Sequence, residues 1–431
     1  MSLTTNNTPS SSIESGNKKS TPIQDSPSDG LDSTYSWIVA VTATLGYLMI
    51  FGNFNAFGIF QEYYINTMFP NVAVGTVSWI GTISFTISLA GGVFASGILS
   101  IIGIRYTALL GCLLSSIGLL FASFSNAIWQ LVITQGLIFG LGSSLIINCC
   151  LLMPSLWFEK HKILAIAMIS SGSGYGTLVI GPIITRTIKR YGIHWSFRIL
   201  FFMNFAVTGL VAAVFKPRTE FKPLRTVVRL SLLKKPLTLF ICFGGFFCQW
   251  GYTIPSLYFP ASYRAIGGTR TASSNTIIAF SIASGTSRIS SAFLAKKFGA
   301  NTTLIFAMLI SAILIFSIWL TTKNLTVYYV FYTLYGFACP LLFPLSPVII
   351  ANNYPTEEIS QVNGLLYLFY GLSTLVGTPI AGLVFDHLGT RENYKPVIIL
   401  GGILYIISCL ILVAQLVYCK KYIPKLKTGR I

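Results

Sequence analysis

The sequence predicts an all-α membrane protein in which twelve transmembrane helices form two six-helix bundles. Of its 431 residues, 53% are hydrophobic and only 9% are charged, whereas a soluble protein carries about 25% charged residues. From Trp37 onward, twelve apolar segments each approach the ~20 residues that a helix needs to cross a bilayer. None of these segments alternates with the period of two that a membrane β-barrel requires, which leaves helices as the predicted form.

The two ends of the chain differ from the rest in composition. Residues 1–35 are rich in Ser, Thr, Asn and Pro, so we expect a disordered cytoplasmic tail. This tail lacks the charged start, apolar middle and cleavage site of a signal peptide, and the first apolar segment is therefore expected to be retained. Residues 420–431 form a basic tail, which is also predicted to be cytoplasmic.

The apolar segments divide into two groups of six, joined by a basic linker at residues 216–235. The predicted N-terminal bundle spans residues 36–215, with apolar segments at 37–60, 76–99, 104–124, 128–156, 163–185 and 197–215. The predicted C-terminal bundle spans residues 236–419, with apolar segments at 235–258, 273–294, 302–322, 327–351, 360–385 and 396–419.

The distribution of positive charge predicts that both chain ends are cytoplasmic. In that orientation nineteen of the 29 Lys and Arg residues lie on the inner side, nine lie outside and Arg288 lies within a helix, as the positive-inside rule requires. Cytoplasmic loops account for the net charge of +18 better than binding to nucleic acid does, because the cations are scattered. One cluster, Arg186, Lys189, Arg190 and Arg198, falls outside against this rule.

Catalytic and metal-binding patterns are missing from the sequence. The eight cysteines lie in apolar segments or at their ends without CxxC spacing, and His161, His194 and His387 share no ligand spacing. We therefore predict no metal site, no cofactor and no enzymatic activity. The sequence contains no GxxxxGK[ST] motif, which argues against transport driven directly by ATP.

Two glycine and proline features recur at nearly one offset, which indicates an internal duplication. Gly103 follows the second apolar segment and Gly299 follows the eighth, 196 residues later. Pro182 ends a small-residue stretch in the fifth segment and Pro379 lies in the eleventh, 197 residues later. A parallel repeat of six helices is typical of transporters whose two halves rock around a central site.

The stretch from Pro154 to Pro182 joins two membrane-length segments through a short turn, Glu159 to Lys162. Its two cations favour a cytoplasmic hairpin, and we predict that Lys160 and Lys162 belong to an inner gate. The following helix carries a series of serine and glycine residues that allow another helix to approach closely. Helix packing alone would also explain these small residues.

Five motifs in order resemble the monocarboxylate-transporter-like branch of the major facilitator superfamily, and most of all its fungal members. The motifs are FGNFNAFGIFQEYY (51–64), QGLIFGLGSS (135–144), WFEKHKILAIAMISSGSGYG (157–176), SGTSRISSAFLAKKFG (284–299) and GLSTLVGTPIAG (371–382). The resemblance implies the major facilitator fold, with the first, fourth, seventh and tenth helices lining a central cavity.

The sequence also departs from this family. Animal proton-coupled members have a lysine in the first helix, where this chain has Asn53, Phe54 and Asn55. They have an acid one turn before the arginine of the eighth helix, where this chain has Ser284. With no Asp, Glu or His predicted at mid-membrane, we expect no proton relay within the protein.

Arg288 is the most informative candidate residue, because it is the only charge predicted well inside a helix. Such an arginine costs about 2.5–3.5 kcal/mol on insertion scales, so it is expected to face a water-filled cavity or a bound anion. The alternative is that Arg288 snorkels toward the cytoplasmic end or binds backbone carbonyls. Polar and aromatic residues of the cavity-lining helices complete the predicted substrate-binding set, although each could instead pack between helices: Asn53, Asn55, Asn148, Gln249, Trp250 and Phe343.

These observations predict a secondary transporter that moves a small organic solute, a monocarboxylate or related organic anion, by alternating access. Two alternatives stay open: a facilitator of a larger polar or aromatic, vitamin-like solute, and a non-transporting membrane sensor on the same fold. The plasma membrane is the predicted location in preference to an internal membrane. The sequence makes no prediction of the oligomeric state.

Overall fold

A computed structural model describes residues 30–72, 74–217, 230–390 and 392–422, and every regular element in these ranges is a helix. The elements of the first half are α1 (Thr34–Asn55), α2 (Phe57–Tyr63), η1 (Tyr64–Met68), α3 (Val74–Ala90), α4 (Gly92–Ala122), α5 (Ile128–Leu131), η2 (Val132–Ile138), α6 (Phe139–Trp157), α7 (Lys162–Tyr191) and α8 (Ile193–Val214). Those of the second half are η3 (Leu230–Lys234), α9 (Pro236–Ala265), α10 (Arg270–Phe298), α11 (Ala300–Leu314), η4 (Ile315–Trp319), α12 (Leu325–Ala338), η5 (Cys339–Leu341), α13 (Leu342–Asn353), α14 (Thr356–His387) and α15 (Lys395–Tyr422).

The predicted all-helical membrane fold is confirmed. Eleven described helices are long and apolar enough to cross a membrane, and Gly75–Ala90 forms a shorter apolar helix. The backbone turns sharply within α4 at Gly103, whose φ is 80°, a conformation that glycine adopts without strain. Residues 92–102 therefore continue the pass begun by α3, residues 104–122 form the next pass, and the described chain crosses twelve times.

Several helices extend further than their apolar segments predict. The predicted segment 163–185 becomes α7, which continues to Tyr191 and carries Lys189 and Arg190 in its last turn, where cations are favoured by the helix dipole. The guanidinium of Arg198 lies 4.8 Å from the ring centre of Trp195. These cations, which are predicted to lie outside, thus belong to helix ends rather than to a loop, because charged residues can continue a helix beyond the hydrocarbon layer.

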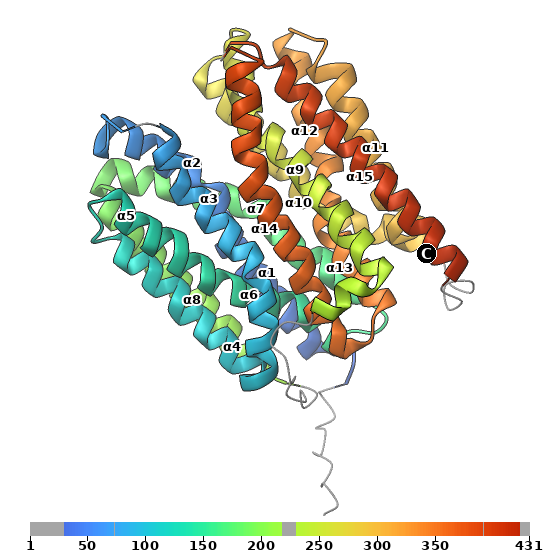
Figure 1. The fold of residues 1–431 in the computed structure, drawn as a ribbon. Helices are drawn as coiled ribbons and strands as arrows, with labels where there is room; N and C mark the ends of the chain where they lie inside the picture. Colours follow the sequence, from blue (N-terminus) through green and yellow to red (C-terminus); the bar gives the residue numbers. More distant parts are fainter. Residues whose placement is uncertain (1–29, 73, 218–229, 391, 423–431) are drawn as a thin grey trace, which may run out of the picture.

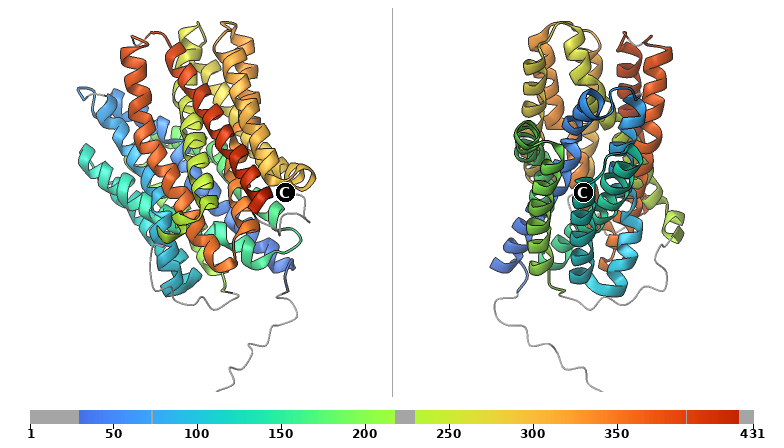
Figure 2. Two further views of the ribbon diagram at one scale, coloured as in Figure 1. Left: turned by 45° about the vertical axis from the view of Figure 1, so that its right-hand side comes forward. Right: turned by 90° about the vertical axis from the view of Figure 1, so that its left-hand side faces the viewer.

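The helices pack as two sets that meet along a few elements. In the first half α1 packs against α7, and α4 packs against α6 and α8; in the second half α9 packs against α14 and α15. Between the halves, α7 contacts α10 and α13, while α14 contacts α3, α4 and α6. Figures 1 and 2 show the two sets converging near α13 and spreading apart toward α2 and α12. The central site must therefore be sought where α7 of the first half meets α10 and α13 of the second half.

Glycines bring the two halves into backbone contact. A Cβ atom on Gly174 of α7 would lie 2.5 Å from the backbone nitrogen of Gly285 on α10. On Gly364 of α14 it would lie 2.8 Å from the carbonyl oxygen of Gly92. No larger residue fits without displacing the neighbouring helix, so small residues set this close approach.

The predicted terminal tails and basic linker lie largely outside the described residues. The structure describes residues 30–35 of the first tail, residues 216, 217 and 230–235 of the linker, and residues 420–422 of the second tail. The predicted domain boundaries and the predicted cytoplasmic side therefore stay predictions. Below, the hairpin end denotes the end of the molecule that carries residues 158–161, between α6 and α7.

Candidate functional site

Arg288 joins the two halves of the protein near the middle of the membrane-spanning region. It lies about one turn past the midpoint of α10 and is only 4% exposed. Its Nη1 donates hydrogen bonds to the backbone oxygen of Ser170 at 3.0 Å, to the hydroxyl of Ser170 at 3.3 Å and to the hydroxyl of Ser173. Both serines belong to the small-residue stretch of α7, so the sequence pattern and the lone arginine meet at one place.

The remaining edge of the Arg288 guanidinium has no hydrogen-bond partner among the described residues. Its Nε has no acceptor among the described residues, and none is found there for its Nη2. The guanidinium carbon lies 4.6 Å from the ring centre of Phe343 on α13, which supports it by a cation–π contact. Nε and Nη2 together form the fork through which an arginine binds a carboxylate by two parallel hydrogen bonds.

The sequence left open that Arg288 snorkels toward a surface or binds backbone carbonyls, and the structure gives a different answer for each. Arg288 does bind a backbone carbonyl, that of Ser170. Its low exposure shows that it does not snorkel to a surface. The carbonyl of Ser170 binds only Nη1 of Arg288, and the fork formed by Nε and Nη2 stays without an acceptor among the described residues.

Aromatic side chains from four helices gather around Arg288. Tyr47 of α1, Tyr252 of α9 and Tyr367 of α14 are close enough to interact electrostatically with the guanidinium. The ring of Phe343 lies 5.3 Å from that of Tyr252 and 6.1 Å from that of Tyr370. Sequence reasoning selected Phe343 but missed Tyr47 and Tyr252, although Tyr252 follows the predicted Gln249 and Trp250 closely.

Carboxylates are far from this cluster. The described acids lie in connections or near the ends of membrane spans, such as Asp32 before α1, Glu358 in the first turn of α14 and Asp386 in its last turn. No group of three or more His, Cys, Asp or Glu residues that could hold a metal ion occurs in the part of the chain that the structure describes. Arg288 therefore lacks an internal counter-ion there.

Asn55 is the predicted polar residue that shares a hydrogen-bond partner with Arg288. It is exposed, and its Nδ2 donates to the backbone oxygen of Ser173 at 3.2 Å. The hydroxyl of the same serine accepts from Arg288. Asn55, Ser173 and Arg288 thus come together, and with Phe343 they form the core of the candidate site.

Asn53 and Asn148 have other surroundings. Asn53 donates from Nδ2 to the backbone oxygen of Met49, one turn earlier in its own helix. Asn148 donates to the backbone oxygen of Gly92 at 2.8 Å, and its Oδ1 accepts from the hydroxyl of Ser360 on α14 at 3.0 Å. Asn148 is therefore a polar contact between the halves.

Gln249 and Trp250 are placed within the second half. Gln249 is fully buried, and neither its Nε2 nor its Oε1 has a partner among the described residues. Trp250 packs against Gly377 of α14, where a Cβ would lie 2.7 Å from Nε1 of the indole. Packing between α9 and α14 thus occupies Trp250, while the buried amide of Gln249 makes no hydrogen bond with the described residues.

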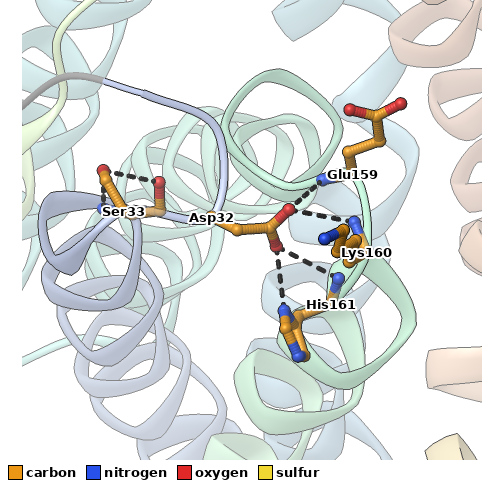
Figure 3. A network of polar contacts seen from close by, with 6 residues as sticks. Asp32, Ser33, Glu159, Lys160 and His161 are labelled. Atoms are coloured by element: carbon orange, nitrogen blue, oxygen red, sulfur yellow. Dashed lines mark hydrogen bonds and ion pairs between the residues drawn. The ribbon is translucent and has the colours of Figure 1, made fainter.

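The hairpin between α6 and α7 is tied down by Asp32, which sequence reasoning did not select (Figure 3). Its carboxylate accepts from the backbone N–H groups of Glu159, Lys160 and His161 at 3.0–3.2 Å, and from Nδ1 of His161 at 3.1 Å. The N–H of Asp32 donates to the backbone oxygen of Trp157. Asp32, a single residue that precedes α1, therefore holds both the end of α6 and the turn that leads into α7.

The hydrogen bonds to Asp32 also determine its acidity. Partial burial by itself raises the pKa of the carboxyl group, but the N–H donors of Lys160, His161 and Glu159 and the side chain of His161 outweigh it. The pKa of Asp32 is therefore lowered from its ordinary value. Asp32 is accordingly ionised at neutral pH and holds the hairpin as an anion.

The two predicted gate lysines differ in position. Lys162 donates from Nζ to the backbone oxygen of Ala351 on α13 at 3.4 Å, across the interface between the halves. The side chain of Lys160 is exposed, and the contact that Lys160 makes with Asp32 comes from its backbone N–H. Lys162 is therefore the hairpin cation that reaches the other half.

The sequence matches the family model described as Major Facilitator Superfamily over residues 37–253 and 239–426. It is 29% identical over 406 residues to the MFS transporter asaE of Aspergillus flavus, covering 92% of this chain and 91% of that protein. It is 24% identical over 410 residues to the riboflavin transporter MCH5 of Saccharomyces cerevisiae, covering 89% of this chain and 78% of that protein.

The fold resembles that of solved transporters. The structure of the proton:xylose symporter XylE bound to 6-bromo-6-deoxy-D-glucose superposes with a TM-score of 0.74 at 14% sequence identity. The superposition covers 90% of this chain and 96% of that one. At this level of identity the likeness concerns the fold alone.

Proposed function

Because this chain belongs to the major facilitator superfamily and is an integral membrane protein that transports small solutes, we propose that its solute is an organic anion held by Arg288. The class we propose is a monocarboxylate or a related organic acid. The predicted monocarboxylate-transporter-like branch is part of this proposal. The family assignment itself is supported by fungal relatives along most of the chain.

The free fork of Arg288 is the observation that carries the proposal. The guanidinium is 4% exposed, and the described residues offer it neither a carboxylate nor any acceptor for Nε. An arginine in this position costs about 2.5–3.5 kcal/mol on insertion scales, and a bound anion would offset part of that cost. A carboxylate matches the fork in both charge and geometry.

The contacts between the halves support alternating access around this site. At the hairpin end, Lys162 contacts Ala351. Deeper in the helices, Asn148 contacts Ser360 and Arg288 contacts Ser170 of α7. Opening toward the hairpin end requires these contacts to separate. A solute bound to Arg288 would lie where α7 and α10 must part, so its release can be linked to that movement.

The surroundings of Arg288 favour a carrier without an internal proton relay. The ionisable residues near it include tyrosines and Cys339 rather than an acid or a histidine. We propose that the solute either carries its own proton or moves down its concentration gradient. An imposed pH gradient is then expected to accelerate transport only weakly.

Two other functions have less support. A facilitator for a larger polar or aromatic solute is favoured by the relative whose name states riboflavin transport. A membrane sensor that transports nothing could share the same fold. For either function we retain the plasma membrane as the proposed location.

An untargeted comparison of solute uptake tests the proposal. Cells that produce the wild-type protein, cells that produce Arg288→Ala in equal amount at the same membrane and cells that produce neither are incubated with one mixture of solutes. We expect the wild type alone to take up or release one or more organic acids. Transport of an uncharged solute at equal rates by the wild type and Arg288→Ala would overturn the proposal, and no transport would favour the sensor.

A further inference from the structure

We propose that the organic anion bound by Arg288 carries a planar aromatic ring, recognised by Tyr252 together with Tyr367. This inference rests on the proposed anion-binding function and narrows its substrate class. It concerns the part of the solute that the arginine fork does not touch. Short aliphatic acids would leave that part of the site unfilled.

The orientation of the guanidinium limits where such a solute can lie. Nη1 is held by Ser170 and Ser173, and the guanidinium carbon lies over the ring of Phe343. An anion must therefore approach the opposite edge, formed by Nε and Nη2. A carboxylate bound to this edge by two parallel hydrogen bonds lies in the plane of the guanidinium.

Aromatic rings of α9 and α14 extend from Phe343, the ring on which the guanidinium lies. On α14, the ring of Tyr370 lies 6.1 Å from that of Phe343, and the ring of Tyr367 lies 5.2 Å from that of Tyr370. Tyr252 of α9 is half-buried, and its ring meets that of Phe343 at an interplanar angle of 84°. A group attached to a carboxylate in the fork is therefore expected to meet these aromatic rings.

The chemistry of these side chains favours an aromatic solute. Aromatic pairs gain stabilisation beyond the burial of apolar area when their rings pack offset or edge to face. Tyrosine also offers a hydroxyl to polar substituents, which a shell built from leucine or phenylalanine could not do. An acid whose ring is conjugated to its carboxylate stays flat, so the fork and the rings can bind it without ordering a flexible chain.

The test measures binding of two acids that differ only in aromaticity. Purified protein in lipid nanodiscs is titrated calorimetrically with benzoate and with cyclohexanecarboxylate, which share the carboxylate and the size of the ring. Benzamide serves as the uncharged aromatic probe. We expect benzoate to bind roughly 3- to 10-fold more tightly than cyclohexanecarboxylate, as one or two aromatic contacts would give, and we expect benzamide to bind at least as weakly as the saturated acid.

Variants show whether the proposed rings cause this preference. Tyr252→Leu removes the ring but keeps an apolar side chain, and we expect the ratio of the two affinities to fall to near one. The matched control is Tyr258→Leu on the same helix, because the ring of Tyr258 packs against Phe385 away from Arg288. The control is expected to keep the wild-type ratio.

The outcomes separate this inference from the proposed function. Equal binding of both acids, lost in Arg288→Ala, would overturn the aromatic solute and leave the anion site standing. A preference for benzoate that persists in Tyr252→Leu would overturn the role of these rings. Binding of neither acid, or binding of benzamide as tight as that of benzoate, would overturn both proposals.

Discussion

Arg288 combines a fixed orientation with an unused hydrogen-bonding edge. Serines of α7 hold Nη1 and Phe343 supports the face, so the free fork has one direction. A lysine at this position would keep the charge but would offer neither two parallel donors nor the same stacking. The geometry of the guanidinium should therefore matter as much as its charge.

Substitution of Arg288 tests this point at the scale of one residue. We expect Arg288→Lys to lower the transport rate about tenfold or more, and Arg288→Ala to lower it further, because a lost hydrogen bond to a charged group costs about 1.5–3 kcal/mol. Initial rates of solute uptake, normalised to the protein in the membrane, measure both effects. Wild-type rates in Arg288→Lys would mean that charge alone suffices.

Asp32 has a structural role that can be tested by its pH dependence. Asp32→Ala leaves three backbone N–H groups of the hairpin without their acceptor and should lower the free energy of unfolding by about 1–2 kcal/mol at pH 7. Because the pKa of Asp32 is lowered in the folded protein, this stabilisation is fully present above the ordinary value of 3.8. It is lost as the pH falls through the lowered pKa.

Chemical unfolding of both proteins in detergent at several pH values checks this prediction. The difference in stability between the wild type and Asp32→Ala should be constant near neutrality. It should shrink when the pH is brought below about 4, where the unfolded carboxyl group is protonated. A difference that stays unchanged down to pH 2 would show that the carboxylate charge does not hold the hairpin.

At the scale of one element, the hairpin between α6 and α7 contains two lysines whose roles in transport can be distinguished. Lys162 contacts Ala351 of the other half, whereas the side chain of Lys160 faces outward. We expect Lys162→Glu to slow transport several-fold, because the reversed charge repels the carbonyl and loosens the closed hairpin end. Lys160→Glu is the matched control and should slow it less.

Uptake kinetics and surface labelling of both variants test this prediction. Each variant should reach the membrane in wild-type amounts, because one reversed charge does not change the charge asymmetry of the whole chain. If Lys162→Glu transports at the wild-type rate, the hairpin cations serve only as topological signals. An equal loss in both variants would point to a general effect of charge instead of the contact with α13.

The close contact between α7 and α10 is a second feature whose role can be tested. A methyl group on Gly174 would come within 2.5 Å of the Gly285 backbone, whereas on Gly181 of the same helix its nearest neighbour would be 3.7 Å away. Gly174→Ala should therefore force α7 and α10 apart and lower the transport rate. Gly181→Ala, the matched control, receives the same gain in helix propensity without a clash.

Accessibility measurements distinguish the mechanism from simple unfolding. A cysteine at Ser360, opposite Asn148, is expected to react faster with thiol reagents in the Gly174→Ala background than in the Gly181→Ala background. If the Gly174→Ala and Gly181→Ala proteins transport at equal rates and are labelled at equal rates, the close glycine contact is not required for closure at the hairpin end.

For the whole molecule, composition and repeats were enough to predict the fold. Twelve apolar segments and the recurrence of Gly103 at Gly299 predicted two sets of six helices, because the bilayer allows few alternatives. The segment ends were predicted less well. Helices such as α7 continue through helical turns that carry charged residues, and hydropathy alone predicts loops at such residues.

The site was only partly predictable for a physical reason. Arg288 and the serine-rich stretch of α7 stand out in the sequence, because charge and small residues are unusual in an apolar helix. Tyr47 and Tyr252 do not stand out among 21 tyrosines, since only packing shows which rings face the arginine. Asp32 binds residues more than 120 positions away, and local patterns carry no sign of such a partner.

Counterflow in reconstituted vesicles tests the central claim most directly. Vesicles loaded with an organic acid identified by the uptake comparison are diluted into a trace of the same labelled acid. We predict transient accumulation of label by the wild type, little acceleration by an imposed pH gradient and no accumulation by Arg288→Ala. Strong uphill accumulation that follows the pH gradient and persists in Arg288→Ala would contradict the account.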